Sequence, residues 1–237
     1  MKKSDIRGIT GRAIGEIAVI IIGVLIAFQF EGWRSERELR EQEIAQLHAL
    51  HADFTENVKR LQRVIDRQEE FVASQARLLE IIHGHQDMPN EEALKKLVTE
   101  SFMFSRLEEV LGAYQALVSS GDLRMIRDRK LRAEIAEFVG TLGDGYEDEK
   151  LGLQVRVRLL SEMSSSTDLL AVLQPSFRAF GSLPDSAFDP DFKALLDNRA
   201  YRNHLALLTF IESGQLDFYR GLLASAETIV GIVEQNL

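Results

Sequence analysis

An apolar run opens the chain and gives way abruptly to a charged, amphipathic pattern. Residues 13–30 read AIGEIAVIIIGVLIAFQF, with Glu16 as the one charged side chain among them. A helix of this length rises about 27 Å, close to the roughly 30 Å hydrocarbon core of a bilayer. The pattern predicts a transmembrane helix over residues 13–33, with Trp33 as an anchor at the membrane interface.

A cleaved signal peptide is the competing interpretation, because a basic stretch precedes the apolar run. Glu16 interrupts that run, however, and no small-x-small cleavage site follows Ala27. Later apolar stretches, at 204–211 and 222–233, are too short or are interrupted by Glu227. We therefore expect one uncleaved span.

Beyond Trp33 the apolar residues recur mostly at steps of three, four and seven, and neither proline nor glycine occurs between Arg34 and His83. This spacing predicts one stalk helix over residues 34–83, continuous with the membrane helix and about 80 Å long if straight. A coiled coil fits the pattern, but packing against later helices of the same chain fits equally well. The apolar positions are Leu39, Ile44, Leu47, Leu50, Phe54, Val58, Leu61, Ile65, Phe71, Leu78 and Ile82.

Residues 84–237 contain capping residues and breaks that divide them into further helices. Asn90 is a candidate N-cap for a helix through Phe102, and Asp128 for a long helix that Gly140, Gly143 and Gly145 would kink. The other expected elements are a helix near 107–118, a short turn over 122–126, an irregular connection over 164–190 with a short helix at 168–173, and a final helical region over 191–233 with a break near Asn198 or Asn203.

No segment shows the alternation of a strand, so the predicted fold class is all-α: a transmembrane helix that continues into a stalk, against which later helices pack as an elongated bundle. The predicted organisation is a cytoplasmic tail at 1–12, the span at 13–33, the stalk at 34–83 and the bundle at 84–237.

Charge indicates orientation and excludes one class of partner. Four basic residues precede the span and three follow it closely, which favours a cytoplasmic N terminus and a periplasmic bundle at a bacterial inner membrane. Of the 28 basic and 37 acidic side chains, 24 and 36 lie beyond residue 12, a net charge of −12. Nucleic acid is therefore not an expected partner. The basic residues on the two sides are Lys2, Lys3, Arg7 and Arg12, and Arg34, Arg37 and Arg40.

The sequence contains no recognisable motif of a catalytic site. The chain has no cysteine, His48 and His51 lack a zinc-binding pattern, and Ser164 to Ser166 lack a nucleophile elbow. We expect no enzyme activity, no metal and no cofactor.

Two groups of residues are candidates for protein contacts. Glu16, Gly23 and Ala27 lie on roughly one face of the membrane helix, where small residues permit close approach of another helix, in a different subunit or a second copy. Interfacial anchoring is the alternative role for Glu16. A basic cluster is either a docking patch for an acidic partner or a solvated face paired with Glu134 and Glu137. It comprises Arg124, Arg127, Arg129, Lys130 and Arg132.

Two segments together resemble a bacterial family of membrane-anchored helical proteins catalogued only as a domain of unknown function. The first is AIGEIAVIIIGVLIAFQFEGW, with Gly15, Glu16, Gly23, Gln29 and Trp33, and the second is AYQALVSSGDLRMIRDRKLRAEIAEF, with Tyr114, Ser120, Gly121, Leu123, Ile126 and Leu131. The resemblance implies the membrane-anchored helical topology and no activity.

These observations favour a non-catalytic structural or accessory subunit of a larger membrane assembly, of transport, respiratory or photosynthetic class, with the bilayer and other subunits as partners. The alternative is a periplasmic helical-bundle sensor that binds a ligand and acts through a membrane partner. Lateral contacts along Glu16, Gly23 and Ala27 would favour the subunit, and a buried polar cavity in the bundle would favour the sensor.

Overall fold

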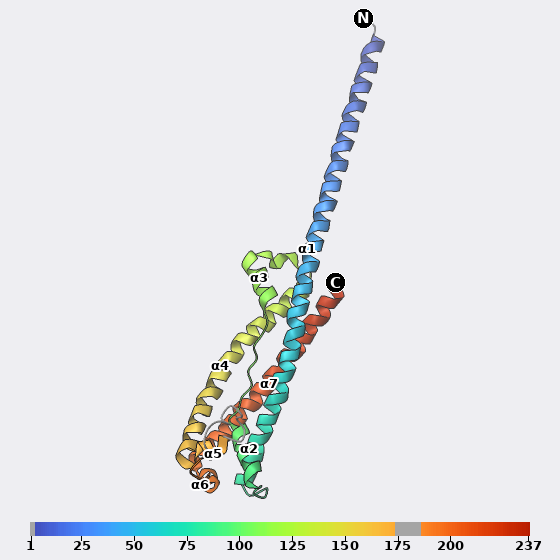
Figure 1. Cartoon of the computed structure of the whole chain (residues 1–237). Coiled ribbons are helices and arrows are strands. Elements are labelled where there is room, and N and C mark those ends of the chain that lie inside the picture. Colours follow the sequence, from blue (N-terminus) through green and yellow to red (C-terminus); the bar gives the residue numbers. More distant parts are fainter. Residues whose placement is uncertain (1–2, 174–185) are drawn as a thin grey trace.

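One very long helix organises the molecule. In the computed structural model, α1 (Lys3–Ile82) runs through the bundle and extends far beyond it toward the N terminus (Figure 1). The structure describes residues 3–173 and 186–237, without the side chains of residues 1–21, 27 and 146–148. The other elements are α2 (Glu91–Ser101), α3 (Gly112–Ser120), the 3₁₀ helix η1 (Asp122–Met125), α4 (Arg129–Ser166), α5 (Leu169–Leu173), α6 (Phe192–Asp197) and α7 (Arg199–Asn236). Over the described ranges the regular structure is entirely helical, which confirms the all-α prediction.

Three helices form the body of the bundle. α7 runs antiparallel to α1 and α4 and packs closely against both, whereas the backbones of α1 and α4 lie farther from each other (Figure 1). The short helices α2, α5 and α6 lie at the end far from the N terminus, and α3 lies at the opposite end. The chain's C terminus returns to the end of the bundle from which α1 extends.

The part of α1 outside the bundle exposes large apolar side chains on every side. The exposed fractions run from 47% at Val24 to 68% at Phe30. Among the residues that the structure describes, no helix combines the length and the apolarity needed to cross a bilayer. The side chains of residues 13–21 and 27, which belong to the predicted span at 13–33, lie outside the described residues.

The bundle has two hydrophobic cores, arranged one after the other along its length. The core nearer the N-terminal extension contains Leu50 and Phe54 of α1 and Phe138 of α4. The rings of Phe54 and Phe138 pack edge to face, with their centroids 5.2 Å apart. The far core takes Leu78 from α1 and Leu159 from α4. On α1 and α7 the two cores are separated by buried polar side chains.

The predicted caps at Asn90 and Asp128 are confirmed, and Asn198 caps a third helix where a break was expected. Asn90, Asp128 and Asn198 each accept hydrogen bonds from backbone N–H groups two or three residues later, at the starts of α2, α4 and α7. A side-chain oxygen at this position satisfies donors that the first helical turn leaves unpaired. The break expected near Asn198 or Asn203 is therefore at Asn198.

The helix predicted near 107–118 is wrong in its first half. The chain is not helical over residues 103–111, and α3 begins only at Gly112. Side chains of α1 hold this segment in place: Asn57 binds both the N–H and the C=O of Val110, and Asp53 accepts from the N–H of Ala113 at the start of α3. These bonds satisfy backbone groups that a helix would otherwise pair internally.

The three glycines that were expected to kink α4 do not interrupt it. One helix passes through Gly140, Gly143 and Gly145. Gly145 has a packing reason instead, because a Cβ atom there would lie 2.3 Å from the Cζ atom of Phe218 on α7. The irregular connection also begins later than residue 164, since α4 continues to Ser166. Residues 174–185 of that connection lie outside the described residues.

Candidate functional site

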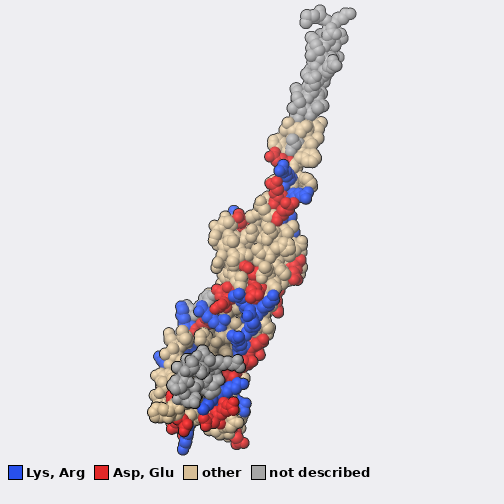
Figure 2. All heavy atoms as spheres, in the orientation of Figure 1, with Lys and Arg blue, Asp and Glu red and all other residues tan. Residues whose placement is uncertain are grey.

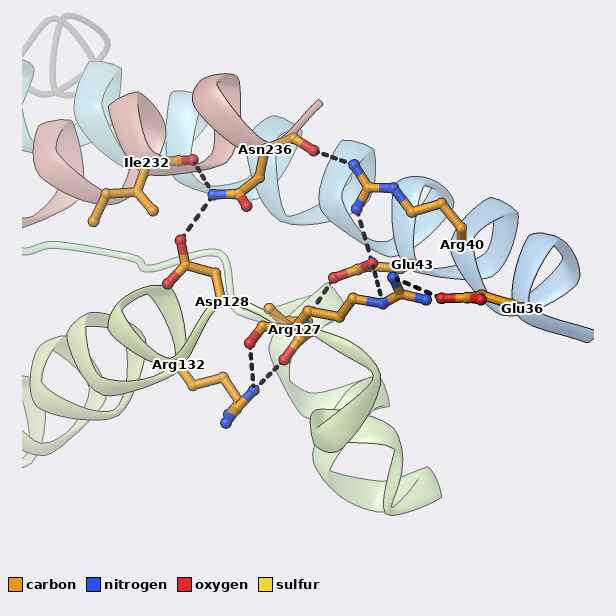
Figure 3. A network of polar contacts seen from close by, with 9 residues as sticks. Glu36, Arg40, Glu43, Arg127, Asp128, Arg132, Ile232 and Asn236 are labelled. Carbon is orange, nitrogen blue, oxygen red and sulfur yellow. Dashed lines mark hydrogen bonds and ion pairs between the residues drawn. The ribbon is translucent and has the colours of Figure 1, made fainter. Parts of the chain in front are cut away.

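A polar junction fixes the bundle to α1 at the end nearest the exposed apolar stretch (Figure 3). Its centre is Glu43, which is 2% exposed. Glu43 accepts hydrogen bonds from Nη1 of Arg40 at 2.8 Å and from the backbone N–H of Arg127 at 2.7 Å. The Nε atom of Arg127 lies 3.4 Å from the same carboxylate. The segment before α4 is therefore held on α1 by a buried charge with two cationic partners.

The last turn of α7 joins the same junction. The backbone carbonyl of Asn236 accepts from Nη2 of Arg40 at 2.7 Å, and its side-chain amide donates to Asp128 at 2.9 Å. Asp128 simultaneously caps α4. Three helices far apart in sequence thus meet in one network, beginning about 10 Å along the helix from Trp33.

The Asp128 cap gives a testable pH dependence. The hydrogen bond from Asn236, and then those from the N–H groups of Leu131 and Lys130, lower the pKa of Asp128 below its ordinary value of 3.8. A lowered carboxyl pKa adds stability above pH 3.8 that is lost as the pH falls through the folded-state value. We expect Asp128→Ala to cost about 1 kcal/mol of unfolding free energy at pH 7 and less at pH 3.

Urea unfolding at the two pH values measures this difference. The exposed Asp122, six residues earlier at the start of η1, provides the control Asp122→Ala, which should change the unfolding free energy much less. An equal cost of Asp128→Ala at both pH values would contradict the role of the ionised carboxylate.

The predicted basic cluster divides into two parts. Arg127 pairs with Glu43 and, at 3.9 Å, with Glu36, and Arg132 donates to the backbone carbonyls of Ile126 and Arg127. Neither arginine is paired with Glu134 or Glu137 as the sequence suggested: the carboxylate partners of Arg127 lie on α1, and Arg132 binds backbone carbonyls. The remaining members, Arg124, Arg129 and Lys130, are exposed.

The predicted membrane-face residues are described only in part. Gly23 has open space around it, with no atom within 4 Å of a Cβ position. Trp33 is exposed, and the guanidinium of Arg37 lies 6.0 Å from its ring centre. The side chains of Glu16 and Ala27 lie outside the described residues.

Residues 103–111, which we call the extended segment, are anchored to α1 by a side-chain amide that pairs with both backbone groups of one residue. Asn57 is fully buried; its Nδ2 donates to the carbonyl of Val110 at 2.8 Å, and its Oδ1 accepts from the N–H at 2.7 Å. Nη1 of Arg60 adds a bond to the carbonyl of Glu108 at 2.8 Å. Residues 108–110 are thereby fixed beside α1.

Asn57→Ala should therefore destabilise the fold by about 2–3 kcal/mol, because both backbone groups of Val110 lose their partner. Denaturant unfolding measures the loss. Gln62→Ala on the exposed side of α1 is the control, because it removes one exposed bond to Asp66 and should cost under about 0.5 kcal/mol. Equal costs for the two variants would contradict this anchoring role.

A buried polar layer separates the two cores. Glu212 of α7 is fully buried and accepts from Nη2 of Arg156 on α4, from Gln68 at 2.8 Å and from Gln75 at 3.2 Å. Gln75 also donates to the carbonyl of Ser101 at 2.9 Å. The layer joins α1, α4 and α7 at one level of the bundle.

Burial shifts both charged groups toward their neutral forms. It raises the pKa of Glu212 and lowers the pKa of Arg156, and their mutual attraction opposes each shift. Three buried atoms of the layer have no hydrogen-bond partner among the described residues: Oε1 of Gln68, Oε1 of Gln75 and Nε of Arg156. The layer therefore retains unused donor and acceptor capacity.

A cleft lies above this layer because α1 and α4 are spread apart. Residues 103–111 run between them, with a hollow of about 430 Å³ lined partly by α1 and another of about 490 Å³ lined partly by α4. Ser105 and Arg106 line both hollows. Figure 2 shows lysine and arginine side chains gathered at this height of the molecule. We call the lining of the two hollows the basic cleft, because its basic residues outnumber its carboxylates Glu56, Glu108 and Glu149; the basic residues are Arg60, Arg63, Arg67, Arg106, Lys150 and Arg156.

Sequence reasoning missed both the polar layer and the basic cleft. A signal for the layer was present: Gln68 and Gln75 continue the apolar face of α1 between Ile65 and Leu78. Glu212 similarly stands four residues from buried leucines on either side. No comparable signal marks the cleft, whose residues come from separate segments. Within the described residues, no three His, Asp or Glu side chains gather in a way that could hold a metal ion.

Comparison with known proteins gives one match. The model of a family of unknown function (DUF6090) matches residues 16–167. This range includes most of α1, the extended segment, the junction residues before α4 and all of α4, and it ends before α7. No curated protein and no solved structure matches the chain. The expected resemblance to an uncharacterised domain family is thus confirmed at that level.

Proposed function

We propose that this chain, which belongs to the DUF6090 family of unknown function, is a non-catalytic accessory subunit anchored in a bacterial inner membrane by α1. The N terminus would be cytoplasmic and the bundle periplasmic, as the basic residues around the span suggest. Other membrane proteins, or a second copy of the chain, would be its partners.

The observation that carries the proposal is the apolar surface of α1 outside the bundle. Its large side chains point to all sides of the helix at successive rotations of 100° per residue, and none is covered by the described part of the chain. A helix that is apolar all round requires lipid or protein on every side. The exposed residues are Ile22, Val24, Leu25, Ile26, Phe28, Phe30 and Trp33.

The polar junction supports the same role. Glu43 lies ten residues after Trp33, about 15 Å along the helix, and ties the bundle to α1 there. A bundle held at a fixed height above the membrane suits a protein that contacts membrane neighbours. The open space around Gly23 is compatible with close approach of another helix on the face predicted from Glu16, Gly23 and Ala27.

Photo-crosslinking in membranes tests this proposal. A photoreactive amino acid at Ile22 or Ile26 should yield adducts with a second membrane protein, whereas the same group at Phe210, which is exposed on the bundle, is the control. Adducts with lipid alone from both α1 positions would overturn the accessory-subunit role through this face.

A second candidate function, a ligand-binding sensor, is favoured by a different observation. The basic cleft lies over a buried polar layer with unused hydrogen-bonding atoms. Gln68 and Gln75 of that layer belong to the helix that continues toward the N terminus. A ligand that reorganised the layer would act on α1 directly and would need a membrane partner to read the change.

A further inference from the structure

We propose that the basic cleft binds a small, soluble polyanion that carries phosphate or carboxylate groups. The inference rests on the second candidate function and names its ligand class. It is independent of the accessory-subunit proposal, because ligand binding is measured on the isolated full chain.

The α1 side of the cleft concentrates positive charge in an acidic protein, whose net charge is −9. Arg60, Arg63 and Arg67 recur at steps of three and four, so they share one face of the helix. Glu56 lies 2.9 Å from Nε of Arg60 and 3.5 Å from Nη2 of Arg63. Arg67 makes no ion pair with any residue that the structure describes. The hollow therefore keeps cationic capacity that its own carboxylates do not satisfy.

The α4 side adds a buried donor. Arg156 lines the hollow, is 7% exposed, and directs Nη2 to Glu212 while its Nε has no partner among the described residues. The ring of Phe104 lies 4.7 Å from the guanidinium carbon and holds it in place. Lys150 lines the same hollow. An anionic oxygen is the group that best satisfies such a donor set.

The position of the cleft identifies the source of the anion. Arg60 and Arg67 lie 27 and 34 residues beyond Trp33, about 40–50 Å along the helix. Lipid headgroups at the predicted membrane surface cannot reach that distance, so the ligand is soluble. The hollows, at about 430 and 490 Å³, lie within the size range of small-molecule sites, roughly 300–1,000 Å³.

Isothermal titration calorimetry on the full chain in detergent tests the proposal, with inorganic pyrophosphate and citrate as probes. Tighter binding of pyrophosphate would indicate a phosphate ligand, and tighter binding of citrate a carboxylate ligand. We expect Arg67→Gln to weaken binding about tenfold and higher salt to weaken it further. Arg77→Gln, ten residues along the same helix, exposed and outside the cleft, should leave affinity unchanged.

Absence of binding heat for both probes at millimolar concentration would overturn the proposal, as would equal losses in Arg67→Gln and Arg77→Gln. Circular dichroism of each variant controls for folding, and Arg67 is exposed, so its replacement should leave the melting temperature unchanged. Neither outcome alters the crosslinks expected from Ile22, so the two proposals fail separately.

Discussion

Replacing Glu212 with leucine is expected to lower the free energy of unfolding by about 3–5 kcal/mol. Arg156 is 7% exposed, and without its carboxylate it would be a buried, unpaired cation. Gln68 and Gln75 would lose their common acceptor in the same step. Urea unfolding followed by circular dichroism measures the loss.

The double variant Glu212→Leu with Arg156→Met separates the pair's net contribution from the cost of breaking it. Since both charges are then removed, we expect most of the lost stability to return. A single variant within 1 kcal/mol of the wild type, or a double variant no more stable than the single one, would contradict the buried pair described here.

Deletion of residues 1–33 is expected to move essentially all of the protein from the membrane fraction to the supernatant, with the bundle still folded. The described contacts of the bundle begin after this point, with the junction at Glu36 and the core at Leu47. Carbonate washing and ultracentrifugation measure the distribution, and circular dichroism measures the remaining helix.

Trp33→Ala is the matched control, because it removes the interfacial aromatic side chain and leaves the apolar run intact. It should remain in the membrane fraction. A truncated protein that stays with the membrane, or release of the Trp33→Ala variant to the same extent as the truncated one, would contradict anchoring by the apolar run.

Local signals explain the parts of the fold that the sequence predicts well. The end of α1 at Ile82 follows from the steps of its apolar residues and from Gly84, two residues later, which has a positive φ of 74°. The capping roles of Asn90, Asp128 and Asn198 also depend only on neighbouring residues. Such features can be predicted without knowledge of the tertiary contacts.

Features that depend on distant residues could not be predicted in this way. The extended conformation of 103–111 is held by Asn57, which lies 53 residues before Val110 in the chain. Arg127, just before α4, likewise pairs with Glu43, 84 residues earlier, and not with the acidic residues of the helix that follows it. In both cases tertiary hydrogen bonds override the local preference.

The candidate site shows the same limit. The membrane-face residues and the basic cluster are recognisable in the sequence because each group is contiguous or periodic. The basic cleft combines α1, the extended segment and α4, so its members come together only once α7 holds those helices apart. Of the polar layer, only the polar residues on apolar faces, such as Gln75 and Glu212, were visible beforehand.

The most direct test of the account is the native mass of the full chain purified in mild detergent, with identification of whatever accompanies it. The account predicts stoichiometric membrane-protein partners that are lost in Gly23→Leu and retained in the control Phe210→Ala. A lone monomer, or a homodimer unaffected by Gly23→Leu, would contradict it.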